Sequence, residues 1–111
     1  MKAPLYGVLF YCSLQSLVGE DAHTTIEKYN ADIMFFSCRG LSLDGRATDF
    51  SVEEDIVRQK MLAHSKVKVL LCAGKKFGNE YMHNLCSARD IDYIISEAPL
   101  PDEISKTVKS L

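Results

Sequence analysis

Two glycine-containing segments follow apolar runs and carry charged side chains, a combination that suits the binding of an anion. Residues 39–49 follow the run that ends at Phe36, and residues 73–78 follow the run that ends at Cys72. Glycine lets backbone N–H groups approach a ligand closely, and a lysine supplies the point charge that a sugar phosphate needs. The candidate binding residues in these segments are Gly40, Asp44, Gly45 and Lys76. The alternative is that the glycines only form turns and that the two adjacent lysines are solvated.

Three consecutive acids, Glu53, Glu54 and Asp55, could supply carboxylates for proton transfer. Acids in the first turn of a helix also occur without any catalytic role, because they complement the positive end of the helix macrodipole. Ser51 precedes Glu54 by three residues, which is the spacing of a capping box at a helix start. The structural interpretation of the three acids is therefore favoured.

The common catalytic, nucleotide-binding and metal-binding motifs are not found in the sequence. Residues 74–76 lack the spacing of a P-loop, and no G-x-G-x-x-G, G-x-S-x-G or H-E-x-x-H pattern occurs. The histidines His23, His64 and His83 are not spaced as ligands of one metal. We therefore expect no metal, no cofactor and no hydrolase activity.

The cysteines indicate reduced, buried thiols. Cys12, Cys38, Cys72 and Cys86 lie far apart along the chain and form no C-x-x-C pair. This spacing fits neither a zinc site nor a thioredoxin-like motif.

Composition suits one soluble domain spanning residues 1–111. The chain has 111 residues, of which 47% are apolar, and its net charge of −2 disfavours nucleic-acid binding by this chain itself. Uncharged apolar stretches such as residues 4–15 fall short of the roughly 20 residues of a membrane span. The amino-terminal residues carry one lysine, Lys2, and no small-residue cleavage site, so a secretory signal is not expected and the cytoplasm is the predicted location.

Predicted strands and helices alternate along the chain. The strand candidates are residues 5–11, 33–36, 67–72 and 91–95. Helices are predicted after Asp21, after Ser51, around residues 81–88 and after a cap at Asp102. The helix after Ser51 is expected to bury Val52, Ile56, Val57 and Met61, and the last helix Ile104, Val108 and Leu111. Such alternation predicts an α/β fold with a mostly parallel sheet flanked by helices, so that segments 39–49 and 73–78 meet at the carboxyl edge of the sheet.

Six short segments, in order and at compatible spacing, resemble motifs of the C-terminal sensor domain of DeoR-type transcriptional regulators. They are residues 16–19, residues 31–36, the loop residues Gly40, Asp44 and Gly45, the helix residues Glu54, Val57, Arg58 and Met61, residues 69–78, and residues 91–97. Arg58 stands where the family pattern has lysine. The resemblance covers the chain from about Ser16 onward.

The resemblance implies a fold like that of NagB, ribose-5-phosphate isomerase and the coenzyme A transferases. It also implies a non-enzymatic role, in which the domain of a repressor senses a phosphorylated sugar or related metabolite. The effector pocket would draw on Gly40, Asp44, Gly45, Glu54 and Lys76. DNA would be bound only through a winged helix-turn-helix domain that this chain does not contain, and no membrane partner is implied.

Besides Arg58 and the missing helix-turn-helix, the sequence departs from the family pattern in two respects. Ala73 replaces an aspartate that could orient Lys76, and no counterpart of the family's first strand, helix and phosphate loop precedes Leu5. Since a missing strand exposes backbone edges and apolar surface, we expect a homo-oligomer. Two other interpretations stay open: a sugar-phosphate isomerase with Glu54 or Asp44 as base and Lys76 holding charge, and a dimerisation module without ligand.

Overall fold

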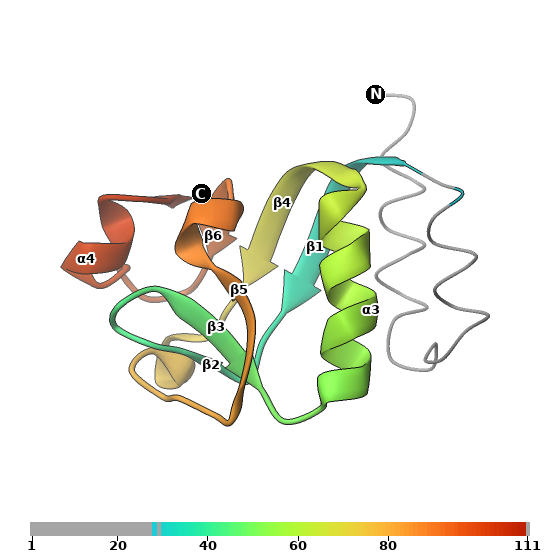
Figure 1. The fold of residues 1–111 in the computed structure, drawn as a ribbon. Helices are drawn as coiled ribbons and strands as arrows, with labels where there is room; N and C mark the ends of the chain where they lie inside the picture. Colours follow the sequence, from blue (N-terminus) through green and yellow to red (C-terminus); the bar gives the residue numbers. More distant parts are fainter. Residues whose placement is uncertain (1–27, 29, 111) are drawn as a thin grey trace.

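A computed structural model describes residue 28 and residues 30–110 of the chain, and Figure 1 shows their arrangement. The strand predicted at residues 5–11 and the helix predicted after Asp21 lie outside the described residues. The predicted α/β class is confirmed, because a parallel sheet forms the centre of the described part and the longest helix packs beside it.

The main sheet has four parallel strands in the order β1, β4, β6, β7. They are β1 (Ala31–Ser37), β4 (Ser65–Leu71), β6 (Tyr93–Ile95) and β7 (Lys109–Ser110). The register places Phe36 opposite Leu70 and Ser37 opposite Leu71. The predictions of strands at 33–36, 67–72 and 91–95, and of parallel pairing, are therefore confirmed to within a few residues.

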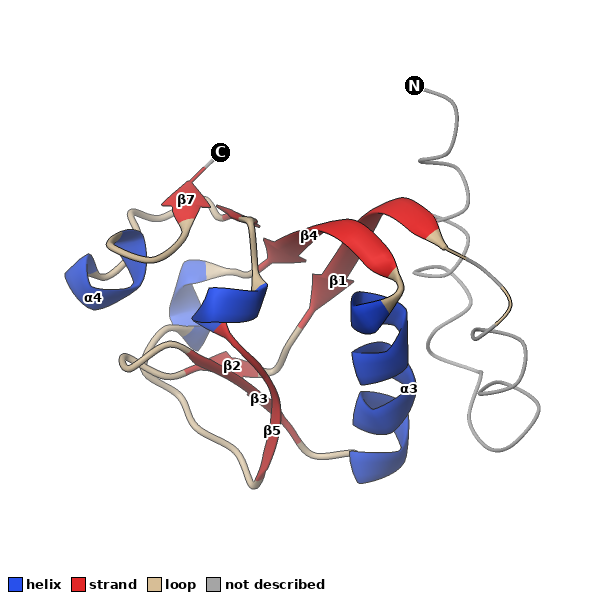
Figure 2. Cartoon of the chain, turned by 45° about the horizontal axis from the view of Figure 1, so that its top comes forward, coloured by secondary structure: helices blue, strands red, loops and turns tan. Residues whose placement is uncertain are grey.

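A second, antiparallel sheet of three strands lies beyond the carboxyl ends of β1 and β4, toward which their arrowheads point in Figure 1. It consists of β2 (Gly40–Leu41), β3 (Arg46–Asp49) and β5 (His83–Ser87). Residues 39–49, predicted as a loop, are in fact largely a hairpin of β2 and β3 that turns at Gly45 with φ +88°. Figure 2 shows β2, β3 and β5 together, below β1 and β4 of the main sheet.

The prediction of a helix around residues 81–88 is wrong, because most of that segment forms β5. His83, Asn84, Cys86 and Ser87 are weak helix formers, and the free edge of β3 offers hydrogen bonds that a single helical turn cannot replace. Leu85 alone in the middle of the strand is 2% exposed and joins the core.

Helix α3 (Val52–Ala63) starts as predicted, with the Ser51 Oγ accepting a hydrogen bond from the Glu54 N–H at 3.2 Å. Two of the four residues predicted to be buried on this helix are buried. Val57 and Met61 are fully buried, whereas Val52 and Ile56 are 38% and 40% exposed. The side of α3 that faces the core is instead completed by Leu62 and two charged residues described below.

The last helix, α4 (Asp102–Ser105), is a single turn. Asp102 does not cap it: Pro101 occupies the cap position and no side chain bonds to the free N–H groups. Ile104 and Val108 are buried as predicted, although Val108 lies beyond the helix, and Leu111 is outside the described residues.

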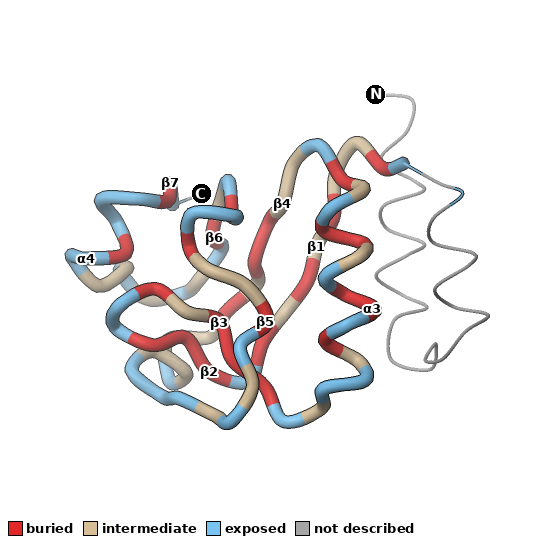
Figure 3. Tube along the Cα trace, viewed as in Figure 1, coloured by how far each residue is buried: buried red, intermediate tan, exposed pale blue. Residues whose placement is uncertain are grey.

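The core lies between the main sheet on one side and α3 with the small sheet on the other. Met34 and Phe36 of β1 and Leu70 of β4 belong to it, and Figure 3 shows buried positions on the strands of both sheets and on α3. The largest fully buried side chains are Phe36, Met34, Leu41, Met61, Leu70 and Ile94. This packing fixes the carboxyl ends of β1 and β4 relative to the hairpin, and so positions the segments that carry the candidate site. Within the described residues, no helix is long and apolar enough to cross a bilayer.

Candidate functional site

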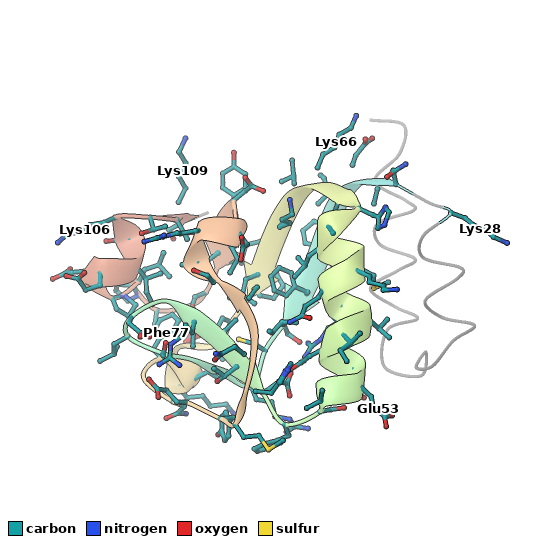
Figure 4. All side chains as sticks on the ribbon, in the orientation of Figure 1. Lys28, Glu53, Lys66, Phe77, Lys106 and Lys109 are labelled. Atoms are coloured by element: carbon teal, nitrogen blue, oxygen red, sulfur yellow. The ribbon has the colours of Figure 1, made fainter. Side chains whose placement is uncertain are left out.

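The segments that follow β1 and β4 lie against each other at one rim of the main sheet, as predicted. The Lys76 ammonium donates a hydrogen bond to the Cys38 carbonyl at 2.9 Å. Leu41 and Phe77 form an isolated parallel bridge, and the Gly78 N–H donates to the Leu41 carbonyl at 2.7 Å. In Figure 4 the labelled Phe77 lies in this region, below the parallel strands. We call this region, residues 38–41 and 73–78, the carboxyl rim.

Gly40 lies at the carboxyl rim. A side chain would not fit there, because the backbone of a neighbouring loop passes directly over it. A Cβ at this position would sit 2.4 Å from the Asn79 carbonyl oxygen and 3.0 Å from the Tyr81 ring. The Gly40 carbonyl accepts a hydrogen bond from the Thr48 Oγ1 at 3.3 Å, and the same hydroxyl oxygen accepts from the Tyr81 N–H at 3.0 Å. Close backbone packing therefore explains this glycine without a ligand.

Asp44 and Gly45 lie at the tip of the β2–β3 hairpin, separate from Lys76. The Asp44 carboxylate accepts hydrogen bonds from the Ser42 hydroxyl and from Arg46 Nε at 3.1 Å, and these partners hold the pKa of Asp44 below its usual value. The Gly45 carbonyl accepts a hydrogen bond from the Ala88 N–H at 2.6 Å.

The hairpin tip borders a hollow of about 410 Å³, which is also lined by Arg89, Glu103 and Thr107.

Glu54 lies in the first turn of α3 and is partly exposed. No hydrogen bond or salt bridge of the described residues joins its carboxylate to Gly40, Asp44, Gly45 or Lys76. Neighbouring Glu53 points outward in Figure 4. Both acids thus fit the helix-start role that the sequence favours.

Asp55, the third acid, belongs to a buried charged cluster that the sequence analysis missed. Its side chain is fully buried and accepts a hydrogen bond from Arg58 Nη2 at 2.6 Å. Asp49 accepts from the same nitrogen, and the Ser37 carbonyl accepts from Arg58 Nη1 at 2.5 Å. His83 Nδ1 lies 2.7 Å from the other Asp55 oxygen.

Arg58 is the centre of this cluster, with a side chain only 7% exposed. Burial acts to lower its pKa, but hydrogen bonds to Asp55 and Asp49 outweigh it and the pKa of Arg58 is raised. The cation therefore joins the end of β1, the end of β3 and the start of α3 through charge-assisted hydrogen bonds. One sequence feature could have pointed to it: Asp55 and Arg58 are three residues apart, the spacing of a helical ion pair.

A second acid that the sequence analysis did not single out, Glu97, caps the backbone at the carboxyl rim. Its carboxylate accepts the Gly74 N–H at 2.6 Å, and chiefly for this reason the pKa of Glu97 is lowered. The carboxylate is exposed and follows β6. An anion approaching the start of segment 74–76 would therefore meet this negative charge as well as the lysines.

A larger hollow of about 490 Å³ opens beside the second half of α3, away from Lys76 and Gly40. It is lined by Gln59, Leu62, Ala63, Lys68, Leu85, Cys86, Arg89, Asp90 and Asp92. Among residues 28 and 30–110, no three His, Cys, Asp or Glu side chains are grouped so that they could hold a metal ion.

Comparison with known proteins identifies the family. The model of the DeoR C-terminal sensor domain matches residues 4–98, more of the amino-terminal part than the motifs alone indicated. The chain is 26% identical over 94 residues to an uncharacterized HTH-type transcriptional regulator, YulB, of Bacillus subtilis. It is 23% identical over 92 residues to the glycerol-3-phosphate regulon repressor of Escherichia coli.

These alignments cover 85% and 83% of the chain, and each covers 36% of the relative. The chain thus spans little more than a third of the length of these regulators. Because the family model matches most of the chain, and its strands and helix start lie where the family motifs predicted them, the chain belongs to the DeoR C-terminal sensor domain family.

Proposed function

We propose that this domain binds a phosphorylated sugar or a related anionic metabolite at the carboxyl rim and thereby controls a transcriptional regulator that acts as a repressor. The observation that carries the proposal is the place of Lys76. Its ammonium sits where β1 and β4 end, against the Cys38 carbonyl, and open parallel sheets bind ligands at this edge. The relative from Escherichia coli is, by its name, a repressor of a regulon for a phosphate ester.

Lys76 retains capacity to bind an anion. An ammonium has three N–H donors, and one of them donates to the backbone carbonyl of Cys38. Within the described part of the chain, no carboxylate forms a salt bridge with Lys76, whereas Arg46 and Arg58 are both paired with acids. Because Lys76 is partly buried, a phosphate there would gain more from the charge than at a fully solvated lysine.

The placement of the acids supports sensing without catalysis. An isomerase of this fold would need Asp44 or Glu54 as a base beside Lys76, but Asp44 is bound to Ser42 and Arg46 at the hairpin tip and Glu54 lies on α3. Gly45 and these two acids would act in the effector response only indirectly, through the shape of the hairpin and the start of α3, whereas Gly40 lies at the proposed binding rim.

DNA contact in the complete regulator is, in this proposal, made by a separate helix-turn-helix segment. The net charge of −2 gives this chain no broad attraction for DNA, and one relative is named as an HTH-type regulator. The proposed site of action is the cytoplasm.

A thermal-shift screen with sugar phosphates and glycerol phosphates tests the proposal. At roughly 100-fold excess over Kd, a ligand of the folded state adds about 2.7 kcal/mol of stability, which raises the melting temperature by about 10 °C. We expect Lys76→Met to abolish most of this shift, because a hydrogen bond to a charged partner is worth about 1.5–3 kcal/mol.

Lys75→Met is the matched control, since it removes the same charge from the neighbouring exposed position. It should leave the shift nearly intact. If no phosphate ester raises the melting temperature of the unmodified chain, the domain has only a structural or dimerising role. If both variants lose the shift equally, the ligand is bound by general positive charge and the assignment to Lys76 is wrong.

We further propose that two copies of the domain associate through apolar residues around the start of α3. Four side chains there are unusually exposed for their type: Phe50 50%, Val52 38%, Ile56 40% and Met82 78%. Phe50 packs edge-to-face on Tyr81, which joins the α3 start to the segment before β5. Sedimentation velocity should show a dimer that Ile56→Lys dissociates, and a monomer for the unmodified chain would refute this.

A further inference from the structure

Two cysteines that are far apart in the sequence lie side by side at the carboxyl rim. Cys38 and Cys72 come directly after the paired residues Ser37 and Leu71 of β1 and β4. Neighbouring strands are about 4.8 Å apart, within the range of Cα separations that a disulfide spans. Both side chains are 3% exposed and belong to the core, on the same face as Phe36 and Leu70.

The two thiols are in contact, and both are reduced in the structure. A hydrogen bond joins Cys38 to Cys72, and Cys72 Sγ in turn lies 3.7 Å from the Ala73 carbonyl. Lys76 sits next to both, with its ammonium on the Cys38 carbonyl. This arrangement supplies a nucleophilic sulfur, a resolving sulfur and a cation within one cluster.

We propose that Cys38 and Cys72 are a peroxide-responsive dithiol that closes to an intramolecular disulfide at the carboxyl rim. The proposal goes beyond effector binding and does not depend on it. The oxidant must be small because both cysteines are almost fully buried. Hydrogen peroxide is small enough.

The chemistry assigns different roles to the two sulfurs. The hydrogen bond from Cys38 and the charge of Lys76 together lower the pKa of Cys72, whereas the pKa of Cys38 is raised. The Cys72 thiolate attacks one peroxide oxygen, the O–O bond breaks, and a sulfenic acid and hydroxide form. The Cys38 sulfur then attacks the sulfenic sulfur, the S–O bond breaks, and water leaves with the Cys38 proton. Overall, two thiols lose two electrons and two protons, and peroxide is reduced to two waters.

Cys86 provides an internal comparison. It is partly buried against the same core, and its burial raises its pKa to about 12 although Arg58 acts to lower the pKa. It should therefore stay reduced under conditions that oxidise Cys72. The closed disulfide would tie together the starts of both rim segments, immediately before Arg39 and Ala73.

Peptide mass mapping of the full chain after treatment with hydrogen peroxide tests the proposal. Trypsin places each cysteine in a different peptide: residues 3–28, 29–39, 69–75 and 77–89. We expect chains that are not disulfide-linked to a second copy to yield a linked pair of peptides, 29–39 and 69–75. Dithiothreitol should separate the two peptides. Unlinked thiols in both peptides, or a link to 3–28 or 77–89 instead, would overturn the proposal.

Single variants test the roles. Cys38→Ala should accumulate a sulfenic acid on Cys72, trapped by dimedone and formed more slowly because the hydrogen bond from Cys38 is lost, while Cys72→Ala should leave Cys38 unreacted. Lys76→Met should slow disulfide formation by roughly threefold to tenfold, because the thiolate fraction falls, and Lys75→Met should not. Sulfenic acid on Cys38 in the Cys72→Ala chain would contradict the assignment. All of these experiments measure masses of the chain without effector. A ligand screen that fails would therefore not affect this test.

Discussion

Arg58→Met is expected to lower the free energy of unfolding by about 3–5 kcal/mol, because it removes the cation from two buried carboxylates. Asp49 and Asp55 are 8% and 0% exposed. The variant leaves Asp55 without its arginine, and it leaves Asp49 only the exposed Arg39 at 3.4 Å. Methionine fills most of the volume, so the loss measures charge rather than a cavity. Urea denaturation followed by circular dichroism gives the value.

Arg46→Met is the control for this result. Arg46 also has two acidic partners, Asp44 and Glu80, but its side chain is 39% exposed. Exposed ion pairs contribute about 0–1 kcal/mol. Equal losses for Arg58→Met and Arg46→Met would show that the buried cluster does not hold β1, β3 and α3 together.

The second large effect is expected from adjacent phenylalanines on β1. Phe36 is fully buried and Phe35 only partly so, because successive side chains of a strand point to opposite faces. Phe36→Ala should cost about 3–5 kcal/mol and Phe35→Ala clearly less. The same urea titrations measure both. A larger loss for Phe35→Ala would mean that the register of β1, and with it the position of Cys38 at the rim, is wrong.

The central strands could be predicted because their residues specify them locally. Residues 33–36 and 67–72 are rich in apolar and β-branched residues, which favour strands of a parallel sheet. The start of α3 was equally clear, since Ser51 and the acids after it act within one turn. In these segments local preference and tertiary packing agree.

The small sheet could not be predicted, because its strands are specified by their partners. Gly40 and Leu41 form a two-residue strand that exists only opposite Ala47 and Thr48. The segment of β5 has one fully buried residue, Leu85, and no clear alternation. Sequence periodicity is too weak over such short lengths, and the pairing energy comes from residues far along the chain.

The candidate site shows the same division. The topology of a parallel sheet was enough to predict that the segments with Gly40 and Lys76 meet. Spacing could indicate the pair of Asp55 and Arg58 within one helix. It could not show that Asp44 turns away at the hairpin tip or that Arg58 also binds Asp49, because these contacts depend on how the hairpin folds back. Nor could a search for C-x-x-C pairs find two cysteines that only the sheet brings together.

The most direct test of the account is to map where an effector binds, using backbone amide NMR spectra of the chain titrated with a phosphate ester that raises its melting temperature. We predict that the largest shifts fall on residues 38–41 and 73–78. Shifts confined instead to the hollow lined by Gln59, Lys68 and Arg89, with Gly40 and Lys76 unchanged, would contradict it.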